Sequence, residues 1–339
     1  MKILIVTPYL GSTYGGTSKI VLEIVQALSN QGICIDLVTT NANCSNKLDV
    51  PLNTWINKNN YRVQYFSSWH SNDFIFSPSL INWLFKHAKD YSLVHTNTIF
   101  APLISFTHWL CWLYKVPYII TPHGMLEPWA LSYKAWKKRF YYAVVEKLTL
   151  NKAAAIQATA SSESENIKFL GFKNHILMVP NGIHHQEFET LPSPELFYQK
   201  FPATRNKNLI LFLGRIDPKK GLDLLAPAFA KVRNNFPETH LIVAGPDSIY
   251  FLPTVKKYFA SSGCLDAVTF TGMLIGSIKQ AALAAANLYV APSYSEGFSM
   301  SVLEGIASGL PCVITTGCNF PEAAAAKAAH VVDVNADAI

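Results

Sequence analysis

The stretch LILFLGRIDPKKGLDLLAPAFAKV, residues 209–232, contains one complete pattern of strand, loop and helix. Residues 209–213 form an uninterrupted apolar run, which is typical of a strand that helices cover on both faces. A loop with glycine and proline follows, and from Leu222 onward the apolar residues recur at helical spacing. The stretch therefore predicts one unit of a parallel, doubly wound sheet.

The same rhythm extends through the whole chain of 339 residues. The first half has the strand-like runs KILIVTP, CIDLVTT, YRVQYFS, LVHTN, PYIITPH, AAAIQAT and HILMVPNGI, and the second half has NLILFLGR, HLIVAGP, AVTFTG, LYVAPS, PCVITT and AHVVDV. A polar, proline-bearing stretch separates the two sets. A typical domain has about 150 residues, so the length of the chain also suggests two domains. We predict an N-terminal domain at 1–185, a linker at 186–207 and a C-terminal domain at 208–339.

The composition limits the class of protein. Half of the residues are hydrophobic and 15% are charged, which is enough apolar surface for two cores and argues against disorder. The formal net charge of +6 is spread along the chain, so it suits an anionic small molecule or an acidic membrane surface as well as nucleic acid. Because no nucleic-acid recognition motif is present, we expect no nucleic-acid partner.

Cysteine spacing and apolar runs indicate the compartment. The six cysteines include no C-x-x-C pair, and a glycine-rich turn follows the initial apolar run MKILIVTPYLG in place of a signal-peptide cleavage site. Prolines, a histidine and a lysine interrupt the most apolar later window, so no run of about 20 apolar residues could span a bilayer. We expect a soluble, cytoplasmic protein with buried free thiols.

Candidate ligand-binding residues follow the strands, because ligands of such sheets bind at the carboxyl ends of the strands. Gly15 and Gly16 precede an amphipathic helix, where adjacent glycines let free backbone amides approach a phosphate. Their spacing is neither the dinucleotide fingerprint nor a P-loop, and a turn that only connects strand to helix is the alternative. His123 follows another strand beside Gly124; such a histidine is more often structural than catalytic, but its strand-end position favours function.

Two cations follow the strand at 209–213. Arg215 offers a forked set of donors at the strand end and Lys220 offers a point charge at the next turn, so together they could neutralise a diphosphate. A solvated basic turn is the alternative, and we favour it for Lys219.

The stretch SEGFSMSVLEGIASG, residues 295–309, adds two carboxylates. Glu296 is predicted in a loop at the carboxyl edge of the sheet, and Glu304 more than a turn inside the following helix. Carboxylates at these different depths suit the hydroxyls of a sugar and a ribose, while the amides at 297–299 suit a phosphate. The alternative is an ordinary surface glutamate and a loop acid near a helix N-terminus.

Together these motifs resemble the retaining glycosyltransferases of family 4. The resemblance rests on Gly15–Gly16, PNG at 180–182, GRIDPKKG at 214–221, and the glutamate pair in SEGFSMSVLEGIASGLP at 295–311. These motifs occur in the family's order and cover essentially the whole chain. The resemblance implies an α/β fold of the GT-B class, with two facing Rossmann-like doubly wound domains and an interdomain cleft.

The resemblance also implies roles for residues of the C-terminal domain. Arg215 and Lys220 would bind the diphosphate of a nucleotide sugar and stabilise the charge on the departing nucleotide. Glu304 would hold the ribose hydroxyls, and Glu296 would contact the donor sugar. The backbone amides that would assist Glu296 are those of Gly297, Phe298 and Ser299.

In the N-terminal domain, the resemblance implies that Gly15 and Gly16 close on the phosphates. His123, in TPHGMLEPWAL, matches the family's histidine that reaches the donor sugar. The residues expected to act in catalysis are therefore His123, Arg215, Lys220 and Glu296.

The implied reaction moves a hexose from a UDP-, GDP- or ADP-sugar to a saccharide or lipid-linked acceptor, with retention, in exopolysaccharide, cell-envelope or glycolipid synthesis. We expect no metal and no cofactor, because no DxD cluster is present and two cations can replace the metal. The alternatives are another GT-B enzyme, such as an epimerase or phosphorylase, and a nucleotide-sugar-binding protein with impaired catalysis. A glycoside hydrolase needs two carboxyls that flank one bond, which this glutamate pair does not provide.

Two further features concern the membrane and the chain's end. The segment at 129–147 interleaves aromatic and basic residues, so it suits either an interfacial helix on anionic lipid at the inner face of the plasma membrane or a domain helix with its aromatics in the core. Family members continue past the segment that ends here at Ile339, so we expect a C-terminal domain shortened at this end.

Overall fold

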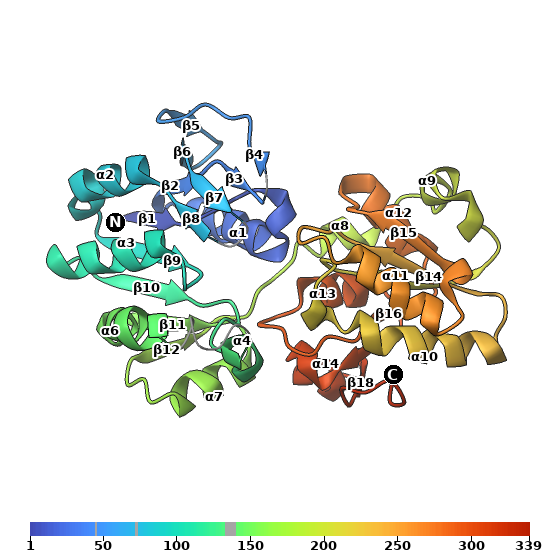
Figure 1. Ribbon diagram of the computed structural model, residues 1–339. Helices are drawn as coiled ribbons and strands as arrows, with labels where there is room; N and C mark the ends of the chain where they lie inside the picture. The colour runs from blue at the N-terminus through green and yellow to red at the C-terminus, as the bar shows by residue number, and fades with distance from the viewer. Residues whose placement is uncertain (45, 72–73, 133–139) are drawn as a thin grey trace. The chain divides into compact units, whose positions relative to one another are not determined.

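The computed structural model describes residues 1–44, 46–71, 74–132 and 140–339 (Figure 1). The chain forms two compact units, Met1–Asn181 and Gly182–Ile339. Each unit is built around its own parallel sheet, and each of the thirteen predicted strand runs contains a strand. The α/β class with two doubly wound sheets is therefore confirmed, while a cleft between the domains stays a prediction.

The sheet of the first unit has the strand order β12-β11-β10-β9-β1-β2-β6-β5, and all pairs are parallel except β5 with β6. The order reverses at β1, which lies between β2 and β9. Its strands are β1 Lys2–Val6, β2 Cys34–Thr40, β5 Trp55–Asn57, β6 Arg62–Phe66, β9 Leu93–Asn97, β10 Tyr118–Thr121, β11 Ala155–Ala158 and β12 His175–Met178. Two small antiparallel strand pairs, which the sequence did not predict, join β3 Ala42–Asn43 with β4 Asn46–Lys47 and β7 Trp69–Ser71 with β8 Phe74–Phe76.

Helices cover both faces of this sheet. Successive side chains of β1 point to opposite faces, and both sets are apolar and buried. Ile3 and Ile5 belong to a core cluster with Val21 of α1, whereas Leu4 belongs to a second cluster with Leu103 of α3. The helical segments of the unit are η1 Ser12–Tyr14, α1 Gly16–Asn30, α2 Pro78–His87, η2 Ala88–Asp90, α3 Pro102–Leu113, α4 Pro128–Ser132, the π-helical η3 Tyr142–Glu146, α6 Lys147–Lys152 and α7 Ser161–Phe169.

The sheet of the second unit is parallel throughout, in the order β15-β14-β13-β16-β17-β18. Its strands are β13 Asn208–Leu213, β14 Thr239–Ala244, β15 Val268–Gly272, β16 Leu288–Ala291, β17 Cys312–Thr315 and β18 His330–Val332. The order reverses between β13 and β16, and a reversal of this kind is where open α/β sheets bind ligands. The helical segments are α8 Gln186–Glu189, α9 Glu195–Lys200, η4 Pro202–Thr204, η5 Pro218–Lys220, α10 Leu222–Asn235, α11 Leu252–Ser261, η6 Leu265–Ala267, α12 Gly276–Ala285, α13 Met300–Ala307, η7 Thr316–Cys318 and α14 Pro321–Ala325.

The segment 186–207, predicted as a linker, folds with the second unit. Phe188 of α8 and Phe197 of α9 are buried in the same cluster as Leu209 of β13. Polar and proline residues dominate the segment's composition. Burial of these two aromatic side chains is nevertheless favourable in free energy, which keeps the segment folded against the sheet.

The segment at 129–147 is described only in part. Residues 133–139 lie outside the described residues, so the expectation of an interfacial helix there stays a prediction. None of the helices in the described ranges has both the length and the apolar character that crossing a bilayer requires. All six cysteines are free thiols; Cys111, Cys264, Cys312 and Cys318 are buried, whereas Cys34 is exposed.

Replacing Phe197 with alanine tests whether 186–207 belongs to the core. Because this side chain is fully buried, we expect Phe197→Ala to lower the free energy of unfolding by about 3 to 5 kcal/mol. Leu196→Ala is the matched control, since Leu196 lies on the same helix but is 45% exposed. Urea denaturation measures both variants, and equal stability of the two would contradict the assignment.

Candidate functional site

The loop after β13 packs tightly against its neighbours at the carboxyl edge of the second sheet. Gly221 has a left-handed backbone with φ of 67°, and a Cβ there would lie 1.9 Å from the carbonyl oxygen of Pro292 in the loop after β16. A Cβ on Gly245, after β14, would lie 1.7 Å from the carbonyl oxygen of Gly214. Only glycine permits these approaches, so the loops of three adjacent strands form one surface.

Glu296 is the buried acid of this surface. Its Oε1 accepts hydrogen bonds from Nζ of Lys220 at 2.5 Å and from Oγ of Ser293 at 2.8 Å. The backbone of Glu296 is also fixed, because its amide donates to the carbonyl of Gly317 at 2.8 Å and its carbonyl accepts from Nδ2 of Asn319 at 2.5 Å. The structure thus brings together Lys220 and Glu296, which are far apart in the sequence.

Cations control the charge of this carboxylate. Burial raises the pKa of Glu296, but the charges of Lys220 and Lys219 outweigh that effect and hold it at about 2. The Nζ of Lys219 lies 3.8 Å from Oε2 of Glu296, and burial, together with the charges of Lys220 and Arg215, lowers the pKa of Lys219. The interpretation of Lys219 as a solvated turn residue therefore misses its proximity to the acid.

Arg215 is the unpaired cation of the group. Its guanidinium has no ion-pair or hydrogen-bond partner among the described residues, in contrast to the ammonium of Lys220. Lys219 and Lys220 thus lie beside one buried carboxylate, and the charge of Arg215 acts on Lys219. This excess of positive charge suits an anionic ligand that also carries hydroxyl groups.

The segment between Glu296 and α13 presents backbone donors. The amides of Gly297, Phe298 and Ser299 donate to no residue in the part of the chain that the structure describes. The ring of Phe298 packs on that of Phe320 with 5.0 Å between centroids, which anchors the segment. Free amides beside a helix N-terminus favour an anion.

Glu304 occupies the second turn of α13 and is buried. Its Oε1 accepts a hydrogen bond from Nζ of Lys279 on α12 at 2.7 Å. Sequence reasoning missed Lys279, although it is the single charged residue of the helix sequence GSIKQAALAA, and a lone charge on an apolar helix is a usable signal. Both glutamates of the motif are therefore held by lysines.

In the first unit, His123 lies at the carboxyl end of β10 with a left-handed φ of 52°. Its Nε2 hydrogen-bonds Oδ1 of Asn97, the last residue of β9, at 2.9 Å. Burial, followed by the charge of His95, lowers the pKa of His123 to about 3, so the imidazole is neutral at physiological pH. The ring can therefore exchange hydrogen bonds with a ligand but carries no charge.

Glu163, which the sequence did not single out, supports this loop. Its Oε1 accepts the amide of Gly124 at 2.5 Å, and its Oε2 accepts the amide and hydroxyl of Thr159 at 2.8 Å each. These bonds fasten the residue after His123 to the start of α7. They explain how the strained backbone at His123 is maintained.

Gly15 and Gly16 lie where the loop after β1 enters α1. Gly15 precedes the helix with φ of 79°, and Gly16 is its first residue and is exposed. The first unit therefore holds Gly15, Gly16 and His123, and the second unit holds Arg215, Lys220, Glu296, Gly297, Phe298, Ser299 and Glu304.

Two family models cover almost the whole chain. One, described as Glycosyltransferase Family 4, matches residues 14–187, and the other, described as Glycosyl transferases group 1, matches residues 207–339. The two matched ranges contain every predicted site residue.

Individual proteins resemble the chain along its length. The mannosylfructose-phosphate synthase of Agrobacterium fabrum is 25% identical over 91% of this chain and 73% of its own length. The alpha-monoglucosyldiacylglycerol synthase of Streptococcus pneumoniae is 27% identical over 67% of this chain and 52% of its own length. Among solved structures, the sucrose-phosphate synthase of Thermosynechococcus elongatus superposes with a TM-score of 0.79 at 21% identity, covering 100% of this chain and 88% of that one.

Removal of the charge of Lys220 tests the buried pair. At neutral pH we expect Lys220→Met to lower the free energy of unfolding by about 3 to 5 kcal/mol, because it leaves the Glu296 carboxylate buried without its partner. The folded-state pKa of Glu296, about 2, is below the ordinary value of 4.5. The stabilisation that the pair contributes is therefore present above pH 4.5 and is lost as the pH falls toward 2.

The measurement is the unfolding temperature of the two proteins as a function of pH. The difference between them should shrink on acidification, and a constant difference would count against the pair. Lys231→Met is the control: Lys231 pairs with Asp337 on the surface, and this variant should behave like the parent at every pH.

Proposed function

This chain belongs to glycosyltransferase family 4, and from that premise we propose that it transfers a hexose from a nucleotide-diphosphate sugar to a saccharide or lipid-linked acceptor, with retention of the anomeric configuration. The observation that supports this most directly is the buried carboxylate of Glu296, which contacts Lys220 and Lys219, together with Arg215, whose charge acts on Lys219 and which has no partner among the described residues. Such a group offers cations to a diphosphate and an acceptor oxygen to the hydroxyls of the attached sugar.

The diphosphate would bind to cations and backbone amides together. Arg215 supplies a forked set of donors and Lys220 a point charge, while the amides at 297–299 and the N-terminus of α13 supply further donors. The ammonium of Lys220 donates a hydrogen bond to Glu296. A phosphate oxygen would share this ammonium, so the lysine would link the phosphate to the carboxylate that contacts the sugar.

The two glutamates would divide the donor between them. Oε1 of Glu296 is occupied by two donors, and Oε2 lies 3.8 Å from Lys219, which leaves lone pairs on Oε2 for sugar hydroxyls. Glu304, on the next helix, would accept hydrogen bonds from the ribose hydroxyls. His123 would reach the donor sugar as a neutral hydrogen-bonding group.

The departing nucleotide diphosphate needs its negative charge stabilised. As the glycosidic bond breaks, positive charge develops on the sugar and negative charge on the nucleotide diphosphate, so fixed cations beside the diphosphate lower the barrier. Arg215 and Lys220 would supply these charges, and we propose that the reaction needs no metal ion. Each such preorganised donor is typically worth about 10² to 10³ in rate.

The compartment and pathway complete the proposal. Six free thiols fit a reducing compartment, so we assign the reaction to the cytoplasm. The names of the two relatives describe one sugar-phosphate product and one glycolipid product, which supports a role in polysaccharide, cell-envelope or glycolipid synthesis without choosing the acceptor.

Nucleotide release from a panel of UDP-, GDP- and ADP-hexoses tests the donor site. We expect the purified chain to release nucleotide from one of them in a buffer with EDTA, and Glu296→Ala and Lys220→Ala to lower the rate about 100-fold or more. Lys231→Ala, on the exposed face of α10, is the matched control and should keep the parental rate. Full turnover by either site variant would refute the assignment, and binding without turnover would identify a binding protein instead.

The configuration of the product tests retention. A diphosphate held by Arg215 and Lys220 would stay beside the anomeric carbon and could take the acceptor's proton on the face that it leaves. We therefore expect an α-linked donor to give an α-linked product, as measured by proton NMR of the transferred sugar. A β-linked product would show that the mechanism inverts.

A further inference from the structure

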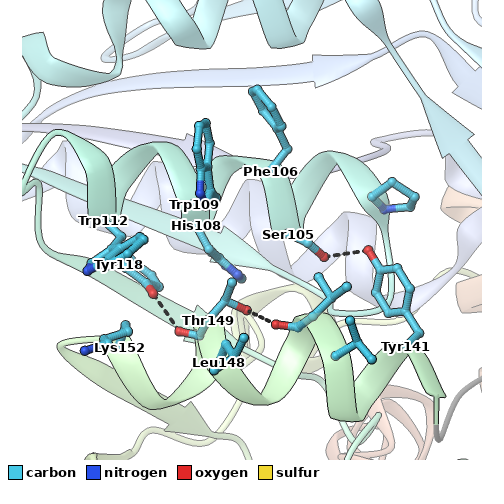
Figure 2. Close-up of a pocket in the computed structure, with 13 residues that line it drawn as sticks. Ser105, Phe106, His108, Trp109, Trp112, Tyr118, Tyr141, Leu148, Thr149 and Lys152 are labelled. Carbon is cyan, nitrogen blue, oxygen red and sulfur yellow. Dashed lines mark hydrogen bonds between the residues drawn. The ribbon is translucent and has the colours of Figure 1, made fainter.

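The first unit contains a pocket that the donor chemistry does not use. It lies between α3 on one side and η3 with α6 on the other, and its volume is about 510 Å³ (Figure 2). Its walls are mainly apolar and include Phe106, Trp109, Trp112, Val144 and Leu148. A pocket of this size and lining is typical of a site for a small apolar group.

The apolar walls are open to solvent. Trp109 is 45% exposed and Trp112 is 57% exposed on α3, and Leu148 is 65% exposed on α6. Neighbouring exposed residues of this size cost free energy in water, so they indicate a surface that another molecule covers. The indole rings, which combine an apolar body with one N–H group, suit the boundary between hydrocarbon and water.

The charges around the pocket favour an anion. The two stretches that form it, residues 102–115 and 140–152, contain Lys115, Lys147 and Lys152 but only one acid, Glu146. That acid is buried, where its Oε1 accepts the amide of Phe100 at 2.8 Å and Oγ of Ser105 at 2.9 Å. Of the three lysines Lys152 lines the pocket itself, and no acid does, so the formal charge of the lining is positive.

The pocket runs in the direction of the strands, between the two edges of the sheet where the strands begin and end. Helix α3 begins at Pro102, soon after β9 ends at Asn97, whereas α6 ends at Lys152, shortly before β11 begins. One end, near Ser105 and Tyr141, therefore lies toward the carboxyl edge that carries His123, and Lys152 lies at the opposite end. Helix α3 has twelve residues and spans about 18 Å, and the lining residues on it run from Pro102 to Trp112.

We propose that this pocket binds one hydrocarbon chain of a lipid with an anionic headgroup. A peptide helix is about 10 Å in diameter, whereas one extended hydrocarbon chain is far thinner and suits a pocket of this size. Burial of the chain against the aromatic walls supplies the affinity, and Lys152 at one end of the pocket selects the headgroup. The proposal concerns binding alone and does not depend on the donor reaction.

The probe is lysophosphatidylglycerol brominated in its single chain, titrated below its micelle concentration into the full chain. Bromine quenches tryptophan, so we expect saturable quenching that is lost in the double variant Trp109→Phe and Trp112→Phe. Leu148→Asp places a charge in the pocket and should weaken binding at least tenfold. Phe169→Asp is the matched control, because Phe169 is 90% exposed on α7 of the same unit and does not line the pocket; it should bind like the parent.

The headgroup is tested with brominated lysophosphatidylcholine. We expect this zwitterionic probe to bind at least tenfold more weakly than the anionic one, and Lys152→Ala to reduce that preference. Equal binding of both probes, or equal binding by Leu148→Asp and Phe169→Asp, would overturn the proposal. Absent quenching together with self-association that Leu148→Asp abolishes, measured by size-exclusion chromatography, would replace the lipid with a second copy of the chain.

Discussion

The buried ion pair between Lys220 and Glu296 joins two loops that follow different strands, β13 and β16. Burying either charge without the other would strongly destabilise the fold, so the position of each loop depends on that of the other loop. The backbone supplies a second link, because the amide of Tyr294 donates to the carbonyl of Lys219 at 2.8 Å. The cations, the carboxylate and the free amides of the second unit are held in place by this pairing.

The first unit uses a buried carboxylate in a different way. Glu163 fixes the loops after β10 and β11, but its partners are amides and a hydroxyl, which carry no charge. Burial raises the pKa of Glu163, whereas neighbouring cations hold that of Glu296 at about 2. The carboxylate of Glu163 therefore shapes a backbone loop beside His123. The carboxylate of Glu296 stays ionised, because neighbouring cations stabilise its negative charge.

The strands and their end residues could be predicted because both signals are local. A continuous apolar run marks a strand, and the residue after it lies at the sheet edge whatever the rest of the chain does. The role of 186–207 could not be predicted in this way, because two buried phenylalanines outweigh a polar composition only once α12 and the sheet are in place. The lone charge of Lys279 on its helix is a local signal, but its pairing with Glu304 is not, because the two residues belong to different helices.

The sequence by itself determined the two sheets, the residues at their carboxyl edges and the resemblance to the family, because hydrophobic periodicity and motif spacing are properties of short segments. The tertiary structure decided which of these residues meet. Lys220 and Glu296 are 76 positions apart, and they touch because the strand order places β13 beside β16. The pocket between α3 and α6 also exists only in three dimensions, since its walls come from segments separated by β10.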